Sequence, residues 1–199
     1  MNVATPIIQE REMAQATSTH YESVFDAKAC LDIIDYCKRN LKIEEALAGN
    51  KNNVSSTRKS NIAWIYPSEQ TNHIFHKIIE KTNQINQFYN FDIVGITEPI
   101  QFTSYDGIGN EHYGWHLDMG AKRQSRRKLS LVIQLSDEHD YEGGELQVHS
   151  GSDDDVIKAE IKKQGSMIFF PSYLRHRVTP VTSGHRYSLV SWLSGQPYR

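Results

Sequence analysis

The sequence lacks any apolar run approaching the roughly 18 to 20 residues that a membrane-spanning helix requires. Its first residues also lack the basic start and apolar stretch of a secretory signal. A dominant charge is missing too, because the formal net charge is only −2. No whole-chain field therefore attracts nucleic acid or a membrane surface. We expect a cytoplasmic protein that has no membrane partner.

Cysteine is scarce, and the two residues present are Cys30 and Cys37. They stand seven residues apart in a helix-like segment, which puts them on one face but about 10 Å from each other. That separation is too large for a disulfide. Because no CxxC spacing accompanies them, we expect two small buried thiols rather than a metal or redox site.

The length of 199 residues favours a single domain over residues 1–199. Residues 1–22 are polar and predict an N-terminal arm. We expect residues 23–95 to form supporting helices and a substrate-side loop. We expect residues 96–195 to form the catalytic core.

Two segments show the apolar spacing of helices. Asp26 is placed to cap a helix that runs to about Asn40. A second helix is predicted from about Ser68 to Tyr89, with Phe88 in its apolar stripe. The Asn-rich stretch between the two helices predicts a loop that leads into a short strand, NIAWIY.

After residue 90 the pattern changes to short β-rich runs separated by turn signals such as Gly143-Gly144 and Ser183-Gly184. The runs include EPIQFTSY, KLSLVIQLS, GELQVHS, VIKAEIKK, SMIFFPS and RYSLVSWLSG. We therefore predict a mainly β fold, an antiparallel sandwich or barrel with the two N-terminal helices packed outside one sheet.

The segment YGWHLD contains a candidate pair of metal ligands. His116 and Asp118 alternate along a predicted strand, so their side chains should project to the same side. The pair is weak evidence by itself, because nine histidines in this chain give about half of one His-x-Asp pair by chance.

A second segment strengthens the evidence that this pair binds a metal, because His176 stands ten residues before Arg186. A hairpin at Ser183-Gly184 would place them side by side. Two imidazoles and one carboxylate on one face of Fe(II) leave adjacent positions open for a chelating co-substrate and dioxygen. Structural zinc would need a fourth ligand, for which no residue is placed.

Arg186 and Ser188 share one strand face and offer a guanidinium fork and a hydroxyl, which suit a dicarboxylate. The alternative is an arginine paired with an acidic residue of the protein itself.

These segments together resemble the prolyl-4-hydroxylase-like branch of the 2-oxoglutarate and Fe(II)-dependent oxygenases. The resemblance covers roughly residues 20 to 195 and is carried by YDGIGNEHYGWHLD, RKLSLVIQLSD, YEGGELQV, GSMIFFPSYLRHRVTPVTSGHRYSLVSWLSG and, more loosely, TRKSNIAW. It implies a double-stranded β-helix, or jelly roll. It also implies hydroxylation of a C–H bond coupled to oxidative decarboxylation of 2-oxoglutarate to succinate, with dioxygen as the second co-substrate.

The resemblance implies a role for each matching residue. Iron is held by His116, Asp118 and His176, and Arg186 binds the C5 carboxylate of 2-oxoglutarate with help from Ser188. The expected co-substrate pocket further includes Tyr105, Gln134, Val178 and Trp192. Tyr105 and Trp192 have an alternative role in packing. Gln134 stands where the oxygen-sensing prolyl hydroxylases of animals carry a tyrosine, so the substrate of that subgroup is not transferred.

The substrate is expected to be a prolyl or other residue of a peptide or protein. Arg58 and Ser60 resemble a segment that borders the substrate groove, and Tyr113 is a third expected substrate residue. The basic run Lys122–Lys128 is either a docking patch for an acidic partner or a solvated loop. We note that it has no nearby acid in the sequence.

Two alternatives of other classes stay open. One is an oxygenase of a free small molecule or a nucleic-acid base. Nucleic-acid dealkylases of the superfamily carry a second arginine six residues after the first, where this chain has Trp192, so a nucleic-acid partner is disfavoured. The other is a non-catalytic jelly-roll binding protein, which has no need for the full set of site residues.

Overall fold

The structure, a computed structural model, describes residues 18–46, 57–149, 156–158 and 162–197. Most of the predicted N-terminal arm, the centre of the Asn-rich loop and part of VIKAEIKK lie outside these ranges. The elements in chain order are β1 (Thr19–Tyr21), α1 (Ala27–Asn40), β2 (Glu44–Glu45), β3 (Arg58–Lys59), β4 (Asn61–Ile65), α2 (Asn72–Tyr89), β5 (Ile93–Ile96), β6 (Ile100–Asp106), β7 (His112–His116), the 3-10 helix η1 (Lys122–Arg126), β8 (Arg127–Gln134), β9 (Tyr141–Gly143), β10 (Leu146–His149), β11 (Val156–Lys158), β12 (Met167–Pro171), β13 (His176–Val178) and β14 (Val181–Gly195).

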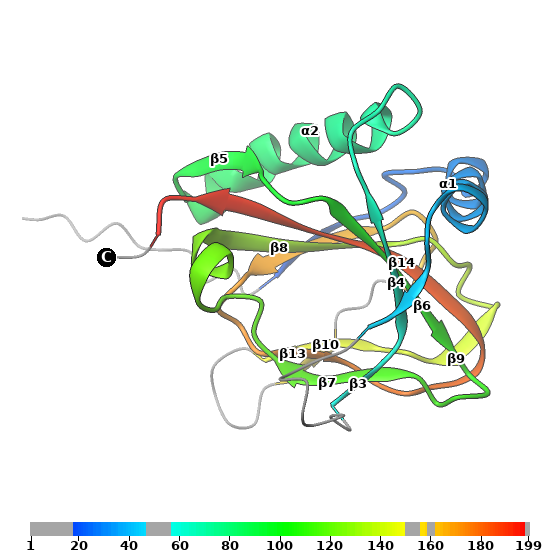
Figure 1. The fold of residues 1–199 in the computed structure, drawn as a ribbon. Coiled ribbons are helices and arrows are strands. Elements are labelled where there is room, and N and C mark those ends of the chain that lie inside the picture. The colour runs from blue at the N-terminus through cyan, green and yellow to red at the C-terminus, as the bar shows by residue number, and fades with distance from the viewer. Residues whose placement is uncertain (1–17, 47–56, 150–155, 159–161, 198–199) are drawn as a thin grey trace, which may run out of the picture.

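The strands form two sheets in which every described pairing is antiparallel. The large sheet has the order β1-β12-β8-β14-β6-β4-β2, and β5 and β9 also pair with β14. The small sheet has the order β11-β10-β13-β7-β3. Figure 1 shows the small sheet below the large one and both α-helices above it. The prediction of a mainly β protein with antiparallel sheets and two helices is confirmed.

The large sheet is buried on both faces, and apolar side chains of its central strands enter two separate cores. On β8, Leu129 and Leu131 belong to the core shared with the helices, whereas Val132 belongs to a second core between the sheets. On β12, Phe169 and Phe170 divide in the same way. Because successive side chains of a strand point to opposite faces of the sheet, each strand contributes to both cores.

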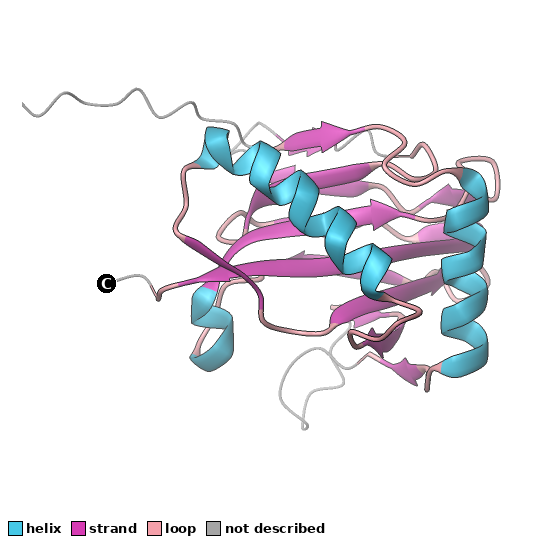
Figure 2. Ribbon diagram, turned by 90° about the horizontal axis from the view of Figure 1, so that it is seen from above, coloured by secondary structure: helices cyan, strands magenta, loops and turns pink. Residues whose placement is uncertain are grey.

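The helices pack on the outer face of the large sheet through the stripes that their spacing predicts (Figure 2). Helix α1 matches its prediction, and the Asp26 side chain accepts a hydrogen bond from the Ala29 amide at 2.7 Å. Helix α2 begins at Asn72 rather than near Ser68. The placement of Phe88 in its core stripe is wrong, because that side chain is 62% exposed.

Burial explains the state of the two thiols. Cys30 and Cys37 are free and fully buried on α1. Burial, with a smaller contribution from Asp26, raises the pKa of Cys30 to about 11. Burial raises the pKa of Cys37 to about 12. Both thiols stay protonated, as expected of core residues.

Neither helix of the described ranges has the length and apolar character needed to cross a membrane.

The predicted hairpin between His176 and Arg186 is wrong. Ser183 and Gly184 lie inside β14, which pairs there with β9 and only afterwards with β6 and β8. Gly184 has a positive φ of 68°, and an added Cβ would collide with the Asp140 carbonyl oxygen. Its flexibility lets β14 bend at this point. His176 and Arg186 therefore belong to different sheets.

Candidate active site

A cavity of about 300 Å³ lies between the two sheets. Of the residues predicted for the site, only Ser60 and Gln134 do not line it; those that do are Arg58, Tyr105, Tyr113, His116, Asp118, His176, Val178, Arg186, Ser188 and Trp192. The remaining lining residues were not expected, and they are Trp64, Gln101, Leu117, Gln124, Arg127, Val132, Leu146 and Val190. The fold brings the sequence motifs together across the inter-sheet space.

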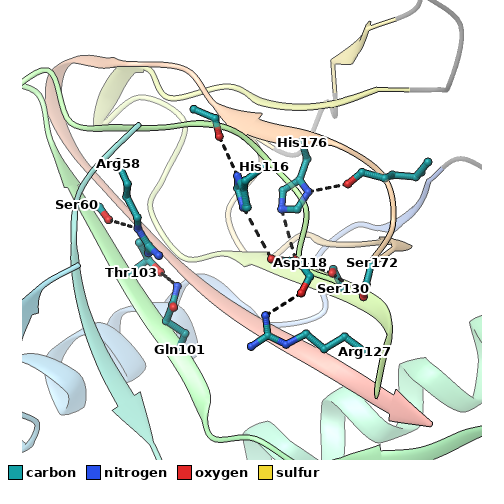
Figure 3. A network of polar contacts seen from close by, with 12 residues as sticks. Arg58, Ser60, Gln101, Thr103, His116, Asp118, Arg127, Ser130, Ser172 and His176 are labelled. Atoms are coloured by element: carbon teal, nitrogen blue, oxygen red, sulfur yellow. Dashed lines mark hydrogen bonds and ion pairs between the residues drawn. The ribbon is translucent and has the colours of Figure 1, made fainter. Parts of the chain in front are cut away.

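Three potential metal ligands meet at one end of this cavity (Figure 3). His116 ends β7 and His176 begins β13, and the two are Cα partners across the small sheet. Asp118 follows β7 rather than lying on it, so the prediction of alternation along one strand is wrong for this residue. The donor atoms of the three lie within 4.8 Å of one another.

Backbone contacts set the tautomer of both imidazoles. The Nδ1 of His116 lies 2.9 Å from the Gly114 carbonyl oxygen, and that of His176 lies 3.0 Å from the Leu174 carbonyl oxygen. Because a carbonyl only accepts, each Nδ1 must carry the proton, which leaves the Nε2 lone pair free for a metal. The Nε2 atoms of His116 and His176 lie 3.8 and 3.4 Å from the Asp118 carboxylate oxygens.

The protonation states also suit metal binding. Burial, with His176 as the next cause, lowers the pKa of His116 to about 4. Burial alone would raise the pKa of Asp118, yet His176, His116 and the Ser130 hydroxyl together hold it below its usual value. A neutral imidazole and an ionised carboxylate are the forms that bind a divalent ion.

Arg186 supplies a buried positive charge at the other end of the cavity. It lies on β14 and is only 2% exposed. Its Nη1 lies 3.5 Å from the Ser188 hydroxyl, and its Nε has no hydrogen-bond partner. No carboxylate of the described residues forms an ion pair with it, which removes the alternative of an arginine paired within the protein. A buried guanidinium without a counter-ion is a site for an anionic ligand.

The comparisons with known proteins agree with this geometry. Residues 100–194 match the family model described as the 2OG-Fe(II) oxygenase superfamily. This match covers just under half of the chain and contains His116, Asp118, His176 and Arg186.

Curated relatives with similar sequences include PKHD-type hydroxylases. That of Synechococcus sp. (strain CC9605) is 45% identical over 83 residues, which are 42% of this chain and 36% of the relative. That of Hyphomonas neptunium is 42% identical over 105 residues, 48% of this chain and 44% of the relative. The matched parts thus span less than half the length of these two relatives.

Solved structures show the same fold at low identity. A Pseudomonas putida prolyl-4-hydroxylase aligns with a TM-score of 0.69 at 22% identity, covering 90% of this chain and 93% of that one. A Trichoplax adhaerens prolyl hydroxylase, solved in complex with a peptide fragment of the hypoxia inducible factor oxygen degradation domain, aligns with a TM-score of 0.70 at 18% identity. It covers 89% of this chain and 83% of that one.

Arg58 and Tyr113, two of the predicted substrate residues, line the cavity. The Arg58 guanidinium lies 4.3 Å from the centre of the Tyr113 ring, which stacks on the His116 imidazole with centroids 3.5 Å apart. Ser60 is buried and accepts a hydrogen bond from Arg58 Nε at 2.9 Å. Ser60 thus orients Arg58 and is not positioned to touch a substrate in the cavity.

Gln134 is also placed differently from its prediction. It is fully buried outside the cavity lining and donates hydrogen bonds to the Ser136 carbonyl and the Tyr141 hydroxyl, each at 3.2 Å. This position does not support a direct contact between Gln134 and a co-substrate in the cavity.

The interpretation of the basic run as a solvated loop is wrong for Arg127, which is buried. Its guanidinium is buried and donates to both carboxylate oxygens of Glu98, at 2.8 and 2.7 Å. It also lies 3.7 Å from the centre of the Trp192 ring, and its Nη1 donates to the Asp118 carbonyl at 3.2 Å. The partner is Glu98, distant in sequence and brought close only by the fold.

Replacing Glu98 with alanine is expected to destabilise the protein by about 3–5 kcal/mol, because the Arg127 charge would stay buried without its partner. Urea unfolding followed by circular dichroism measures the effect. Asp32→Ala is the matched control, since it breaks the exposed Lys28–Asp32 pair and should leave stability unchanged. Equal effects of the two substitutions would contradict the assignment.

Proposed function

We propose that this protein is an Fe(II)- and 2-oxoglutarate-dependent dioxygenase. The proposed reaction couples decarboxylation of 2-oxoglutarate to succinate with hydroxylation of a C–H bond on a prolyl or other residue of a peptide or protein. One cavity holds a cluster of two imidazoles and a carboxylate together with a buried arginine that has no counter-ion among the described residues. This observation carries the proposal.

The donor set fits iron. His116, Asp118 and His176 offer nitrogen and oxygen ligands, and within the described ranges no fourth His, Cys, Asp or Glu joins the cluster. A structural zinc site would be closed by a fourth ligand, whereas oxygenase iron needs open positions. The match to the family model likewise supports Fe(II) and 2-oxoglutarate.

The opposite end of the cavity fits the distal carboxylate of 2-oxoglutarate. We assign this carboxylate to the Arg186 guanidinium, with the Ser188 hydroxyl beside it. Tyr105, whose pKa is raised by burial, keeps its hydroxyl proton and can donate it as a hydrogen bond. Val178 and Trp192 would pack along the chain of the co-substrate, and both line the cavity.

When bound, iron and 2-oxoglutarate supply the oxidising chemistry that a protein side chain cannot. The contribution of the chain is to bind, orient and exclude water. The backbone carbonyls of Gly114 and Leu174 keep the Nε2 atoms of the histidines available. The apolar side chains of Val132, Val178 and Val190 keep the cavity dry, which strengthens the attraction between Arg186 and its anion.

A peptide or protein substrate is supported by the rim and by one neighbour. Trp64 and Leu117 line the cavity and are 36% and 47% exposed, so they offer apolar surface at its mouth. Arg58 and Tyr113 add a guanidinium stacked on a ring. The Trichoplax adhaerens neighbour was solved with a peptide fragment. We further propose that the two sheets form a double-stranded β-helix within a single oxygenase domain.

Succinate formation tests this proposal. The protein, loaded anaerobically with Fe(II), would be mixed with 2-oxoglutarate, air and a library of proline-containing peptides. We expect succinate in a peptide-dependent amount and a mass gain of one oxygen on the peptide. In a parallel assay with free amino acids in place of the peptides, succinate formation with oxygen incorporated only into an amino acid would move the substrate to a small molecule. No succinate from folded, iron-loaded protein would contradict the proposal.

A further inference from the structure

Asp118 is held differently from the two histidines of the cluster. His116 and His176 are strand residues paired with each other across the small sheet. Asp118 lies beyond the end of β7, so no strand pairing fixes its backbone. The neighbouring amide of Met119 donates to the Ser172 carbonyl at 3.0 Å. The position of the carboxylate must therefore depend on contacts from outside its own strand.

The large sheet supplies a contact to the carboxylate itself. Ser130 on β8 donates its hydroxyl proton to Asp118 Oδ2 at 2.6 Å, a length typical of a charge-assisted hydrogen bond. The Ser130 hydroxyl also lies 3.0 Å from that of Ser172. Both serines are fully buried, and the Ser172 amide donates to the Lys128 carbonyl at 2.9 Å. Figure 3 shows the two hydroxyls beside the carboxylate.

A second contact from β8 holds the backbone of the same residue. Arg127 Nη1 donates to the Asp118 carbonyl at 3.2 Å, while Glu98 and Trp192 fix the guanidinium. Asp118 is thus held at its carboxylate and at its carbonyl by residues that stand three apart on one strand. Because β8 pairs with both β12 and β14 in the large sheet, these contacts come from a rigid element.

We propose that Ser130, supported by Ser172 and Arg127, is a positioning residue that keeps the Asp118 carboxylate aimed at the metal site. The inference rests on the proposed function, since it takes the cluster to be a metal site. Without the hydroxyl, the carboxylate loses a buried hydrogen bond and is free to turn away from the imidazoles. Removal of a partner that orients a ligand typically weakens metal binding by about 10- to 100-fold.

The test compares Ser130→Ala with a matched control, Ser191→Ala. Ser191 is equally buried on the large sheet, but its hydroxyl has no hydrogen-bond partner and does not line the cavity. Dissociation constants would be measured anaerobically with Co(II) as the metal probe, following its visible absorption. We expect Ser130→Ala to weaken Co(II) binding by about 10-fold or more and to alter the spectrum of the bound ion. Ser191→Ala should match the wild type.

Thermal unfolding of the metal-free proteins separates a role in positioning from one in folding. If Ser130→Ala only lowered stability while the folded protein bound Co(II) as tightly as wild type, the positioning role would be wrong. If Ser130→Ala did not fold, Ser172→Ala would be tested instead. Weaker Co(II) binding by Ser172→Ala would support the proposal, and unchanged binding would overturn it. Failure of the wild type to bind Co(II) would instead count against the metal site and hence the proposed function.

Discussion

Replacement of His176 with alanine is expected to abolish turnover of 2-oxoglutarate. The substitution removes one of three ligands from the cluster. Bound metal contributes several kcal/mol to reactions of this kind. At about 1.4 kcal/mol per tenfold change in rate, the expected loss is roughly 1,000-fold or more. Succinate formation with saturating Fe(II) and 2-oxoglutarate measures it.

His185→Ala is the control for this substitution. His185 lies on β14 with a 53% exposed side chain and does not line the cavity. It should retain wild-type turnover and metal content. A His176→Ala protein that kept its iron and more than a tenth of its activity would rule out the ligand assignment.

The second large effect is expected from Arg186→Gln. Glutamine keeps hydrogen-bonding groups at this position but removes the buried charge that has no counter-ion in the described protein. Loss of one partner of a buried charged pair costs about 2–5 kcal/mol, which corresponds to a 2-oxoglutarate requirement raised by about 30-fold or more. The measurement is the 2-oxoglutarate concentration that gives half-maximal succinate formation, with Fe(II) affinity expected to stay unchanged.

Arg177→Gln controls for the removal of an arginine. Arg177 lies next to the ligand His176 but binds Gln147 at 2.7 Å and does not line the cavity. It should leave the 2-oxoglutarate requirement unaltered. If Arg186→Gln raised the Fe(II) requirement instead of the 2-oxoglutarate requirement, Arg186 would belong to a different part of the mechanism.

The strands and the residues of the site could be predicted because their signals are local. The runs around Leu131 and Phe169 contain apolar residues on both strand faces, as expected of strands covered on both faces. The His-x-Asp pair, His176 and Arg186 are recognisable by type and order.

Features that depend on long-range contacts could not be predicted. The bend at Gly184 looks like a hairpin turn in the sequence, and only the pairing with β9 shows that β14 continues through it. Arg127 looks like one more cation in a basic run until the fold places Glu98 against it. Phe88 matches the helical period, yet its side chain is 62% exposed in the fold.

One missed residue did leave a local signal. In KLSLVIQLS, Ser130 and Gln134 are polar and flank the apolar Val132 on one strand face. Alternation puts both on the face toward the small sheet, away from the helix-side core of Leu129 and Leu131. A polar residue there must find a buried partner, and for Ser130 that partner is Asp118.

The most direct test of the account is an anaerobic titration of metal-free protein with Fe(II) and 2-oxoglutarate, following the visible charge-transfer absorption of the chelate. We predict a band that requires both components, disappears in His176→Ala and needs much more 2-oxoglutarate in Arg186→Gln. Correctly folded wild-type protein that develops no band would contradict the oxygenase assignment and would favour a non-catalytic binding protein.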